Sequence, residues 1–236
     1  MPKPAAKRFY KHAASAWAAS GFTVELDGRP VRTPVGNPLM LESEALAVAV
    51  AAEWEAQGDN ILPHSMPLSG LACAAIDRVG PERVAVTSMI ASYATTDLLC
   101  YRDDSPSELA ERQHTYWQPL LEWAESDLDA RMAVTEGIVP VQQPEKALLA
   151  LQTAVDALDD FELTALASVT ASTGSLIIGL ALVRGCLTAD QAFQISQIDE
   201  HFQAERWGED AEAQDRCKVL ENDIRTAALF LDLWRG

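Results

Sequence analysis

The segment Phe22–Pro34, F-T-V-E-L-D-G-R-P-V-R-T-P, constrains the fold most, because little else in the 236 residues has a clear β pattern. Residues 23–26 are largely β-branched or apolar and favour a strand, and Asp27-Gly28 is a dipeptide that accepts the positive φ angles of a two-residue hairpin turn. We expect a return strand over residues 31–33, which Pro34 ends. A lone hairpin is at best marginally stable in water, so this one must pack against other elements.

Most of the remaining sequence is typical of helices. Ser43 can cap a helix that extends to Gln57, and Thr188 and Gln191 form a capping box for a helix to about residue 206. A last helix is expected over 210–234. The predicted fold class is α+β: a small N-terminal domain, residues 1–66, with an antiparallel β-hairpin or sheet plus a helix, and a larger all-α C-terminal domain, residues 67–236. Segments 96–102 and 131–141 are candidates to pack with the N-terminal sheet.

Two proline signals occur in the predicted helical domain. Ser105, Pro106 and Glu108 form a capping box with proline at the first helical position, which predicts a helix start. Pro119 lies further along the same helix and lacks a backbone N–H. We therefore expect the helix to bend or restart at Pro119.

The segment Leu163–Val183 is uncharged for 21 residues and so is long enough to span a bilayer. Its middle, S-V-T-A-S-T-G-S, is too polar for a typical span, and Gly174 divides it. This pattern favours two buried helices, and we expect no membrane insertion.

The first 24 residues carry four basic residues and no acid, a composition that resembles an organelle transit peptide. Three aromatic side chains, Phe9, Tyr10 and Trp17, nevertheless indicate anchors for a packed surface. We interpret this segment as part of the fold.

The net charge of −17 makes nucleic acid an unfavourable partner, because it would repel a phosphate backbone. It also disfavours binding to anionic lipid and favours basic protein surfaces. The four cysteines are far apart, which fits buried thiols in a reducing compartment.

No motif for nucleotide binding, zinc proteolysis or serine hydrolysis is present. His201 and Glu205 are four residues apart on one predicted helix, but two ligands do not make a metal site, and a surface pair is the better interpretation. Asp97 lies in an apolar run, where it can cap backbone N–H groups or meet an arginine such as Arg102. We predict no cofactor and no metal.

An acidic segment covers residues 199–223. Most charge-rich helices simply present a solvated face, yet such a surface can also receive a basic partner. Trp207 and the apolar tail that follows favour an interface, because interfaces combine aromatic anchors with a polar rim. The nine acids of the segment are Asp199, Glu200, Glu205, Glu209, Asp210, Glu212, Asp215, Glu221 and Asp223.

Seven strings occur in a specific order along nearly the whole chain. They are R-F-Y-K (8–11), L-D-G-R-P-V-R-T-P (26–34), A-A-E-W-E-A-Q (51–57), M-P-L-S-G-L-A-C-A-A-I-D-R-V (66–79), T-D-L-L-C-Y-R (96–102), G-S-L-I-I-G-L-A-L (174–182) and R-W-G (206–208). This succession resembles the assembly chaperones of F-type ATP synthase that attend the α subunit of its catalytic head.

The resemblance implies a non-enzymatic protein that binds the unassembled α subunit and keeps its interface from aggregating until a β subunit replaces it. It implies an acidic partner contact shortly after Trp207-Gly208, with Glu212 first and Asp215 and Glu209 as alternatives. Trp54, Asp97, Arg102, Asp27 and Gly28 are expected to determine the fold rather than to contact the client.

The resemblance also implies a bacterial, cytoplasmic member, or one in the mitochondrial matrix if the source is eukaryotic. No heptad run demands a dimer, so a monomer is favoured. Two other functions stay open from the residues alone. One is a small helical enzyme that uses buried carboxylates such as Asp97, and the other is a general acidic adaptor for basic clients.

Overall fold

The computed structural model describes residues 6–18, 20–104, 107–137, 139–208 and 210–236. The chain divides into two compact units: unit 1 contains Met1–Arg83 and Leu229–Gly236, and unit 2 contains Val84–Ala228. The division differs from the predicted boundary after residue 66. One reason is Glu53, whose carboxylate accepts hydrogen bonds from the N–H groups of Leu68 (2.7 Å) and Ser69 (2.8 Å) and so ties the next helix to unit 1.

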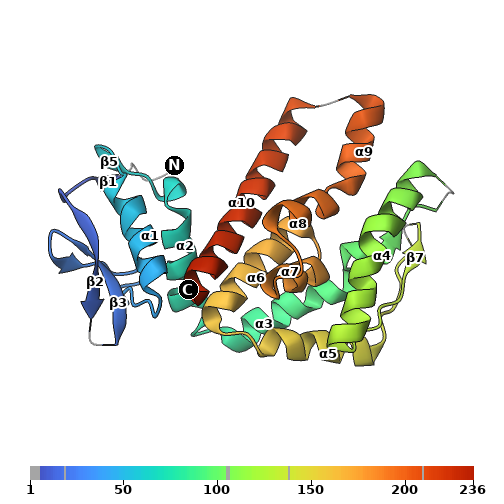
Figure 1. Cartoon of the computed structure of the whole chain (residues 1–236), viewed down its shortest axis with the longest axis horizontal. Coiled ribbons are helices and arrows are strands. Elements are labelled where there is room, and N and C mark those ends of the chain that lie inside the picture. The colour runs from blue at the N-terminus through green and yellow to red at the C-terminus, as the bar shows by residue number, and fades with distance from the viewer. Residues whose placement is uncertain (1–5, 19, 105–106, 138, 209) are drawn as a thin grey trace. The chain divides into compact units, whose positions relative to one another are not determined.

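Unit 1 combines short strands with two helices (Figure 1). Strands β2, β3 and β4 form one antiparallel sheet in that order, and β1 pairs with β5 in a separate antiparallel pair. The elements are β1 (Ala6–Lys7), β2 (Ala13–Ala18), β3 (Gly21–Leu26), β4 (Arg29–Pro30), α1 (Glu44–Glu55), β5 (Asn60–Ile61) and α2 (Pro67–Ala74), which continues as a π-helical turn over Ala75–Val79.

The predicted hairpin is present, and its turn lies where the sequence places it. Asp27 and Gly28 adopt positive φ angles of 48° and 78°, and glycine tolerates this region without a Cβ clash. The return strand is β4 rather than residues 31–33, although Val31 N still donates to Val24 O at 2.8 Å. Pairing with β3 therefore continues for one residue beyond β4, because the nitrogen of Pro30 points away from β3 in this register.

Strand β2 is an element that the sequence does not predict. Its residues, A-A-S-A-W-A, have little β propensity, and they become a strand because β3 supplies a paired neighbour. Of the three aromatic anchors expected before the hairpin, only Tyr10 is buried. Phe9 is 74% exposed and Trp17 is 71% exposed, so these two expectations were wrong.

Helix α1 packs on β2 and β3 and closes the core of unit 1. Ser43 caps it as predicted, with its hydroxyl accepting from Leu46 N at 3.3 Å. Leu46 and Val50 are one turn apart and fully buried, whereas Trp54 is only half-buried. The helix ends at Glu55, two residues before the predicted end.

Unit 2 is a bundle of helices (Figure 1). Its only paired strands among the described residues are β6 and β7, which run parallel. The elements are α3 (Arg83–Ser92), β6 (Tyr101–Arg102), α4 (Glu108–Leu128), β7 (Thr135–Glu136), α5 (Glu145–Asp156), α6 (Asp160–Thr173), α7 (Leu176–Val183), α8 (Ala189–Ser196), α9 (Ile198–Trp207) and α10 (Ala211–Arg235), with 3₁₀ turns at Tyr93–Thr96 and Leu98–Cys100. The part of α10 from Leu229 onward belongs to unit 1.

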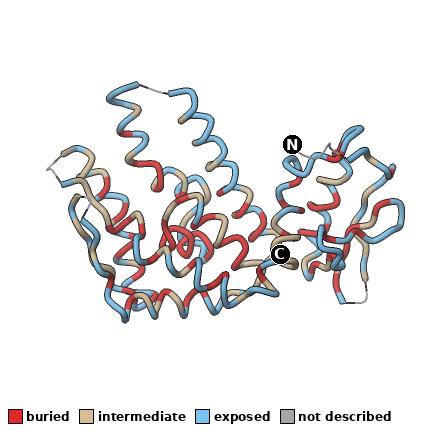
Figure 2. Tube along the Cα trace, turned by 180° about the vertical axis from the view of Figure 1, so that it is seen from behind, coloured by how far each residue is buried: buried red, intermediate tan, exposed pale blue. Residues whose placement is uncertain are grey.

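Helices α6 and α7 confirm the interpretation of the uncharged segment as two helices. Gly174 ends α6 with a φ of 69°, and every residue of α7 is buried. Figure 2 shows the buried positions of unit 2 gathered around these helices. No helix in the described part of the chain combines the length and apolarity that a membrane span requires.

Three expectations for unit 2 differ from the structure. Helix α4 runs unbroken through Pro119, held by buried residues on either side, Trp117 and Leu120. It begins after Ser107, whose hydroxyl accepts from Ala110 N at 3.2 Å, while Ser105 and Pro106 lie outside the described residues. The helix expected from residue 188 to 206 is two helices, because Gln197 leaves helical geometry.

The candidate strands also differ from the expectation. Within the segments 96–102 and 131–141, β6 and β7 pair with one another inside unit 2 and do not extend the sheet of unit 1. Thr135 lies opposite Tyr101 and Glu136 lies opposite Arg102. Residue 138 lies outside the described part of the chain.

Candidate partner-binding site

The acidic segment includes all of α9 after Ile198 and about the first half of α10. We call residues 199–223 the acidic tip. Figure 1 shows α9 and α10 as two neighbouring helices that extend beyond α8 in unit 2, and Figure 2 shows their ends almost entirely exposed. The acidic tip is therefore a projecting, solvated part of unit 2.

Trp207 and Gly208 end α9 and turn the chain toward α10. Gly208 has a φ of 90°, which a residue with a side chain rarely adopts. The Trp207 side chain is 77% exposed, although an indole is a large apolar group that is usually mostly buried. An exposed aromatic residue beside many carboxylates has the composition of an interface.

The predicted contact residues lie near this turn. Glu212 is in the first turn of α10 and Asp215 is almost one turn further; both are exposed. Asp215 Oδ1 forms an ion pair with Lys218 Nζ at 2.9 Å. The Glu212 carboxylate, by contrast, has no ion pair or hydrogen bond among the described residues. Glu209 lies outside the described part of the chain. Glu212 is thus the more available charge for a basic partner.

A buried face of α9 holds the acidic tip on α4. Ile198 and Phe202, four residues apart, are both buried. The guanidinium carbons of Arg112 and Arg206 lie 5.4 and 4.6 Å from the ring centroid of Phe202. Cation–π contacts of this kind add to the apolar packing.

Arg112 joins α4 to α9 through charge. Its Nη2 lies 2.7 Å from Glu108 Oε1 and 2.8 Å from Glu205 Oε2. Hydrogen bonds to these carboxylates raise the pKa of Arg112 above its ordinary value, and the bond from Arg112 lowers the pKa of Glu205. The pair is exposed to solvent, so it orients α9 more than it stabilises the fold.

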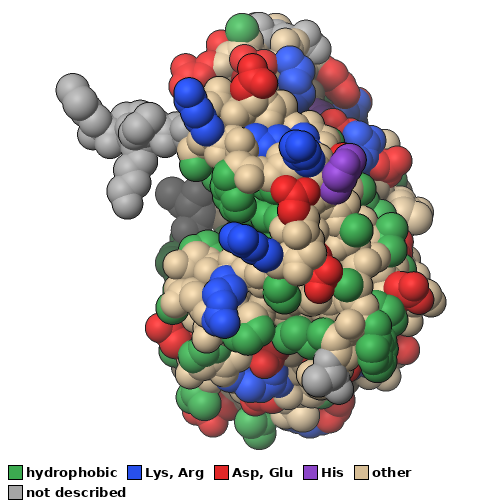
Figure 3. Space-filling view, turned by 90° about the vertical axis from the view of Figure 1, so that its left-hand side faces the viewer, with side chains coloured by type: hydrophobic (Ala, Val, Ile, Leu, Met, Phe, Trp, Pro, Cys, Tyr) green, Lys and Arg blue, Asp and Glu red, His purple; other side chains and the backbone are tan. Residues whose placement is uncertain are grey.

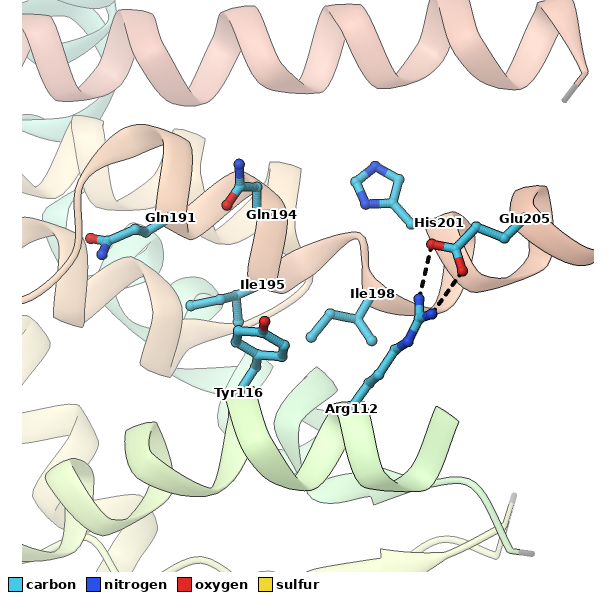
Figure 4. Close-up of a pocket in the computed structure, with 8 residues that line it drawn as sticks. All are labelled: Arg112, Tyr116, Gln191, Gln194, Ile195, Ile198, His201 and Glu205. Atoms are coloured by element: carbon cyan, nitrogen blue, oxygen red, sulfur yellow. Dashed lines mark hydrogen bonds and ion pairs between the residues drawn. The ribbon is translucent and has the colours of Figure 1, made fainter. Parts of the chain in front are cut away.

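A pocket of about 560 Å³ lies between α4, α8 and α9. Figure 4 shows Tyr116, Ile195 and Ile198 at its centre and the Arg112–Glu205 ion pair at one end. His201 lies on the same face of α9 as Glu205, and both residues line the pocket. Because Glu205 is engaged by Arg112, the His201–Glu205 spacing is not a free ligand pair, and no cluster of three metal-ligating side chains occurs among the described residues.

Asp97 is fully buried and lies against the N-terminus of α7. Its Oδ1 accepts from Ser175 Oγ at 2.7 Å and from Leu99 N at 3.1 Å, and its Oδ2 accepts from Ile177 N at 3.1 Å. Burial raises the pKa of Asp97 to about 6, while these hydrogen bonds act to lower it. A carboxylate enclosed in this way has no exposed surface on which to meet a substrate.

The other predicted fold-determining residues lie in separate places. Arg102 does not meet Asp97: its Nη1 donates to Gln113 O at 2.6 Å, and its guanidinium carbon lies 5.0 Å from the centroid of Trp117. In unit 1, the Trp54 carbonyl accepts from Tyr10 Oη at 2.6 Å.

Asp27 and Gly28 occupy the hairpin turn. The Asp27 carboxylate accepts from the N–H groups of Lys11 and His12 at 3.0 Å each, and these bonds lower the pKa of Asp27. Asp27 thus ties the segment before β2 to the turn.

For two residues that organise these sites, the sequence does not reveal the distant partner. Arg112 is 93 residues from Glu205, and Ser175 is 78 residues from Asp97, so only the fold brings the partners together. Ser175 follows Gly174 and precedes an apolar helix, a position that marks it as a cap but does not reveal its buried acidic partner.

Comparison with known proteins agrees with this architecture. Residues 7–125 match the family model of the ATP12 chaperone protein. The crystal structure of Atp12 from Paracoccus denitrificans superposes with a TM-score of 0.93 at 43% identity, covering 98% of this chain and 99% of that one. The mitochondrial protein atp12 of Schizosaccharomyces pombe is 26% identical over 98% of this chain and 84% of its own length.

A more distant relative comes from a second yeast. The mitochondrial protein ATP12 of Saccharomyces cerevisiae is 22% identical over 87% of this chain and 77% of its own length. The family match covers half of this chain, and the structural match covers almost all of it. The chain therefore belongs to the ATP12 chaperone family.

Proposed function

We propose that this protein binds the unassembled α subunit of F-type ATP synthase and shields its assembly surface until a β subunit takes its place. The observation that carries the proposal is membership of the ATP12 chaperone family, with 43% identity to a solved Atp12 across 98% of the chain. A subunit that awaits its neighbours exposes a large, partly apolar interface, which associates wrongly when it is left open.

The acidic tip is the proposed client-binding surface. It supplies an exposed indole at Trp207 and exposed carboxylates at Glu212 and Asp215, of which Asp215 is ion-paired with Lys218. Glu209 belongs to the same stretch of sequence. Negative charge on a projecting element attracts basic surfaces and speeds their encounter, while leaving an affinity low enough for displacement.

The protein is proposed to act without catalysis or a cofactor and as a monomer. The buried position of Asp97 and the engagement of Arg112 by two carboxylates support structural roles for these charged groups. Release then follows from competition by the β subunit. The proposed location is the bacterial cytoplasm, or the mitochondrial matrix if the source is eukaryotic.

Aggregation of the isolated α subunit tests the function. Purified protein, added without ATP at equal molar concentration, is expected to suppress light scattering of the α subunit and to co-purify with it. Isolated β subunit and an unrelated aggregating protein serve as specificity controls. Failure to suppress aggregation together with failure to co-purify would refute the proposal, and equal protection of every client would favour a general adaptor.

A further inference from the structure

The two edges of the sheet in unit 1 differ in how they can meet another strand. At one edge β4 has two residues, Arg29 and Pro30, and a short strand with a charge and a proline resists further pairing. At the other edge β2 has six residues, A-A-S-A-W-A, without a charge or a proline. β2 therefore lacks the features by which proteins usually prevent strand addition.

The register shows which backbone groups of β2 face outward. His12 O accepts from Asp27 N at 3.0 Å, so hydrogen-bonded pairs recur at every second residue, at Ala14 and Ala16. The N–H and C=O groups of Ser15 and Trp17 consequently point away from β3.

These outward groups are open over most of the strand. Ala13 N also points outward and donates to Glu55 Oε2 at 2.6 Å, which closes that end. Within the described residues, no hydrogen bond to the backbone of Ser15 or Trp17 is seen on the outer side. Two residues thus offer unpaired donors and acceptors along one line.

A groove of about 570 Å³ lies beside this edge, between β2 and α1. Val48, Ala51 and Ala52 of α1 line it, together with Glu55 at the end of the helix and Ala56 just after it. Ser15 is on the groove side of the sheet, because its cross-strand partner is the buried Val24. Trp17 is on the same face and is 71% exposed, and Val48 is 50% exposed.

Small side chains along a groove leave room for larger ones from a partner. Figure 3 views the strand side of unit 1 and shows hydrophobic side chains over its lower half, interspersed with charged groups. A strand placed beside β2 would hydrogen-bond to Ser15 and Trp17 and direct alternate side chains into the groove. Because the chain carries a net charge of −17, such a segment is neutral or basic rather than acidic.

We propose that β2 is a strand-addition site that binds an extended segment of the client with apolar side chains at alternate positions. The proposal rests on the function proposed above, since it assigns a second point of contact for the same client. Backbone pairing suits a chaperone, because it recognises extended structure and tolerates side-chain variation.

Hydrogen exchange resolved to single amides tests the site in the complex of the full-length protein with isolated α subunit. The amides of Ser15 and Trp17 are expected to exchange at least tenfold more slowly in the complex. Those of Ala14 and Ala16 are already paired with β3 and serve as internal references. Unchanged exchange at Ser15 and Trp17 in a complex that forms normally would overturn the inference and leave the proposed function intact.

Two variants test the same edge by affinity. Ser15→Pro removes an outward N–H without removing a bond to β3, and Val48→Lys places a charge in the groove. Each is expected to weaken α-subunit binding by about tenfold, the equivalent of one main-chain hydrogen bond or one lost apolar contact. Leu149→Lys is the matched control, because Leu149 is 69% exposed on α5 in unit 2.

The outcomes separate the two proposals. If both edge variants keep their Tm and bind the α subunit with wild-type affinity, strand addition is overturned and the proposed function is not. Absence of binding by the wild-type protein overturns both proposals. The free protein provides a third outcome. If the amides of Ser15 and Trp17 already exchange slowly without the client, and more slowly at higher protein concentration, then a second copy of the chain occupies the edge and the inference is overturned.

Discussion

Ser175 Oγ donates a 2.7 Å hydrogen bond to Asp97 Oδ1, and both residues are fully buried. Ser175 also caps α7, since its Oγ accepts from Ile178 N at 3.1 Å. The eight residues of α7 are all buried, so the first N–H groups of this helix cannot be satisfied by water. Asp97 supplies the missing acceptor, and its negative charge faces the positive end of the helix dipole.

Replacement of Asp97 by alanine is expected to lower the free energy of unfolding by about 3 kcal/mol, because several buried donors lose their acceptor together. Chemical denaturation followed by circular dichroism measures the change. Ser175→Ala is expected to cost less, since Asp97 would keep its backbone bonds. Equal stability of Asp97→Ala and wild type would show that water or a neighbouring group replaces the carboxylate.

The same carboxyl group predicts a dependence of stability on pH. Burial raises the folded-state pKa of Asp97 from 3.8 to about 6, so the folded state holds this proton more tightly than the unfolded state does. Its contribution to stability is therefore fully present below pH 4 and is lost as the pH rises through about 6.

The measurement compares wild type with Asp97→Asn, which cannot titrate at this position. The difference in unfolding free energy, wild type minus variant, is expected to fall between pH 4 and pH 6 and to stay constant above that range. A difference that rises over this interval would mean that the hydrogen bonds outweigh burial and lower the pKa of Asp97.

Local signals in the sequence predict much of the fold, because caps and turns act over a few residues. Ser43, Thr188 and Gly174 mark helix ends that the structure confirms. Strand β2 was missed because its alanines favour no strand until β3 pairs with them. Pro119 was expected to bend α4, yet burial on both sides holds the helix through the missing hydrogen bond.

The candidate site is less predictable, since its geometry depends on contacts between distant segments. The acidic composition of residues 199–223 is visible in the sequence, but the Arg112–Glu205 pair that orients α9 is not. The same holds for β2, where the register and the position of α1 decide which backbone groups stay open.

The close approach of α6 and α7 depends on Gly179. A Cβ at this position would lie 2.7 Å from Thr170 Oγ1 and 2.8 Å from Leu166 Cδ1, both on buried side chains of α6. Gly179→Ala is therefore expected to destabilise the protein by about 1–3 kcal/mol through overpacking.

Gly70→Ala is the matched control, because Gly70 lies within α2 and a Cβ there meets no atom within 4 Å. This second variant is expected to gain about 0.5–1 kcal/mol from higher helix propensity. Thermal unfolding of both variants gives the comparison. A stable Gly179→Ala protein would indicate that α7 can move away from α6 at little cost.

Glu212→Lys tests the acidic tip as the client-binding surface. The Glu212 side chain is exposed and has no ion pair among the described residues, so the change should leave helicity and Tm nearly unaltered. Binding of the isolated α subunit is expected to weaken by about tenfold at low salt, mainly through slower association. The difference should shrink as salt screens the charges.

Glu122→Lys makes the same charge change at an exposed position on α4, and it controls for net charge. If both variants weaken binding equally, the effect belongs to the overall charge of the protein and not to the acidic tip. A large loss of Tm in Glu212→Lys would instead assign Glu212 a structural role. Reduced association for Glu212→Lys alone, with both Tm values preserved, would locate the encounter with the client at the start of α10.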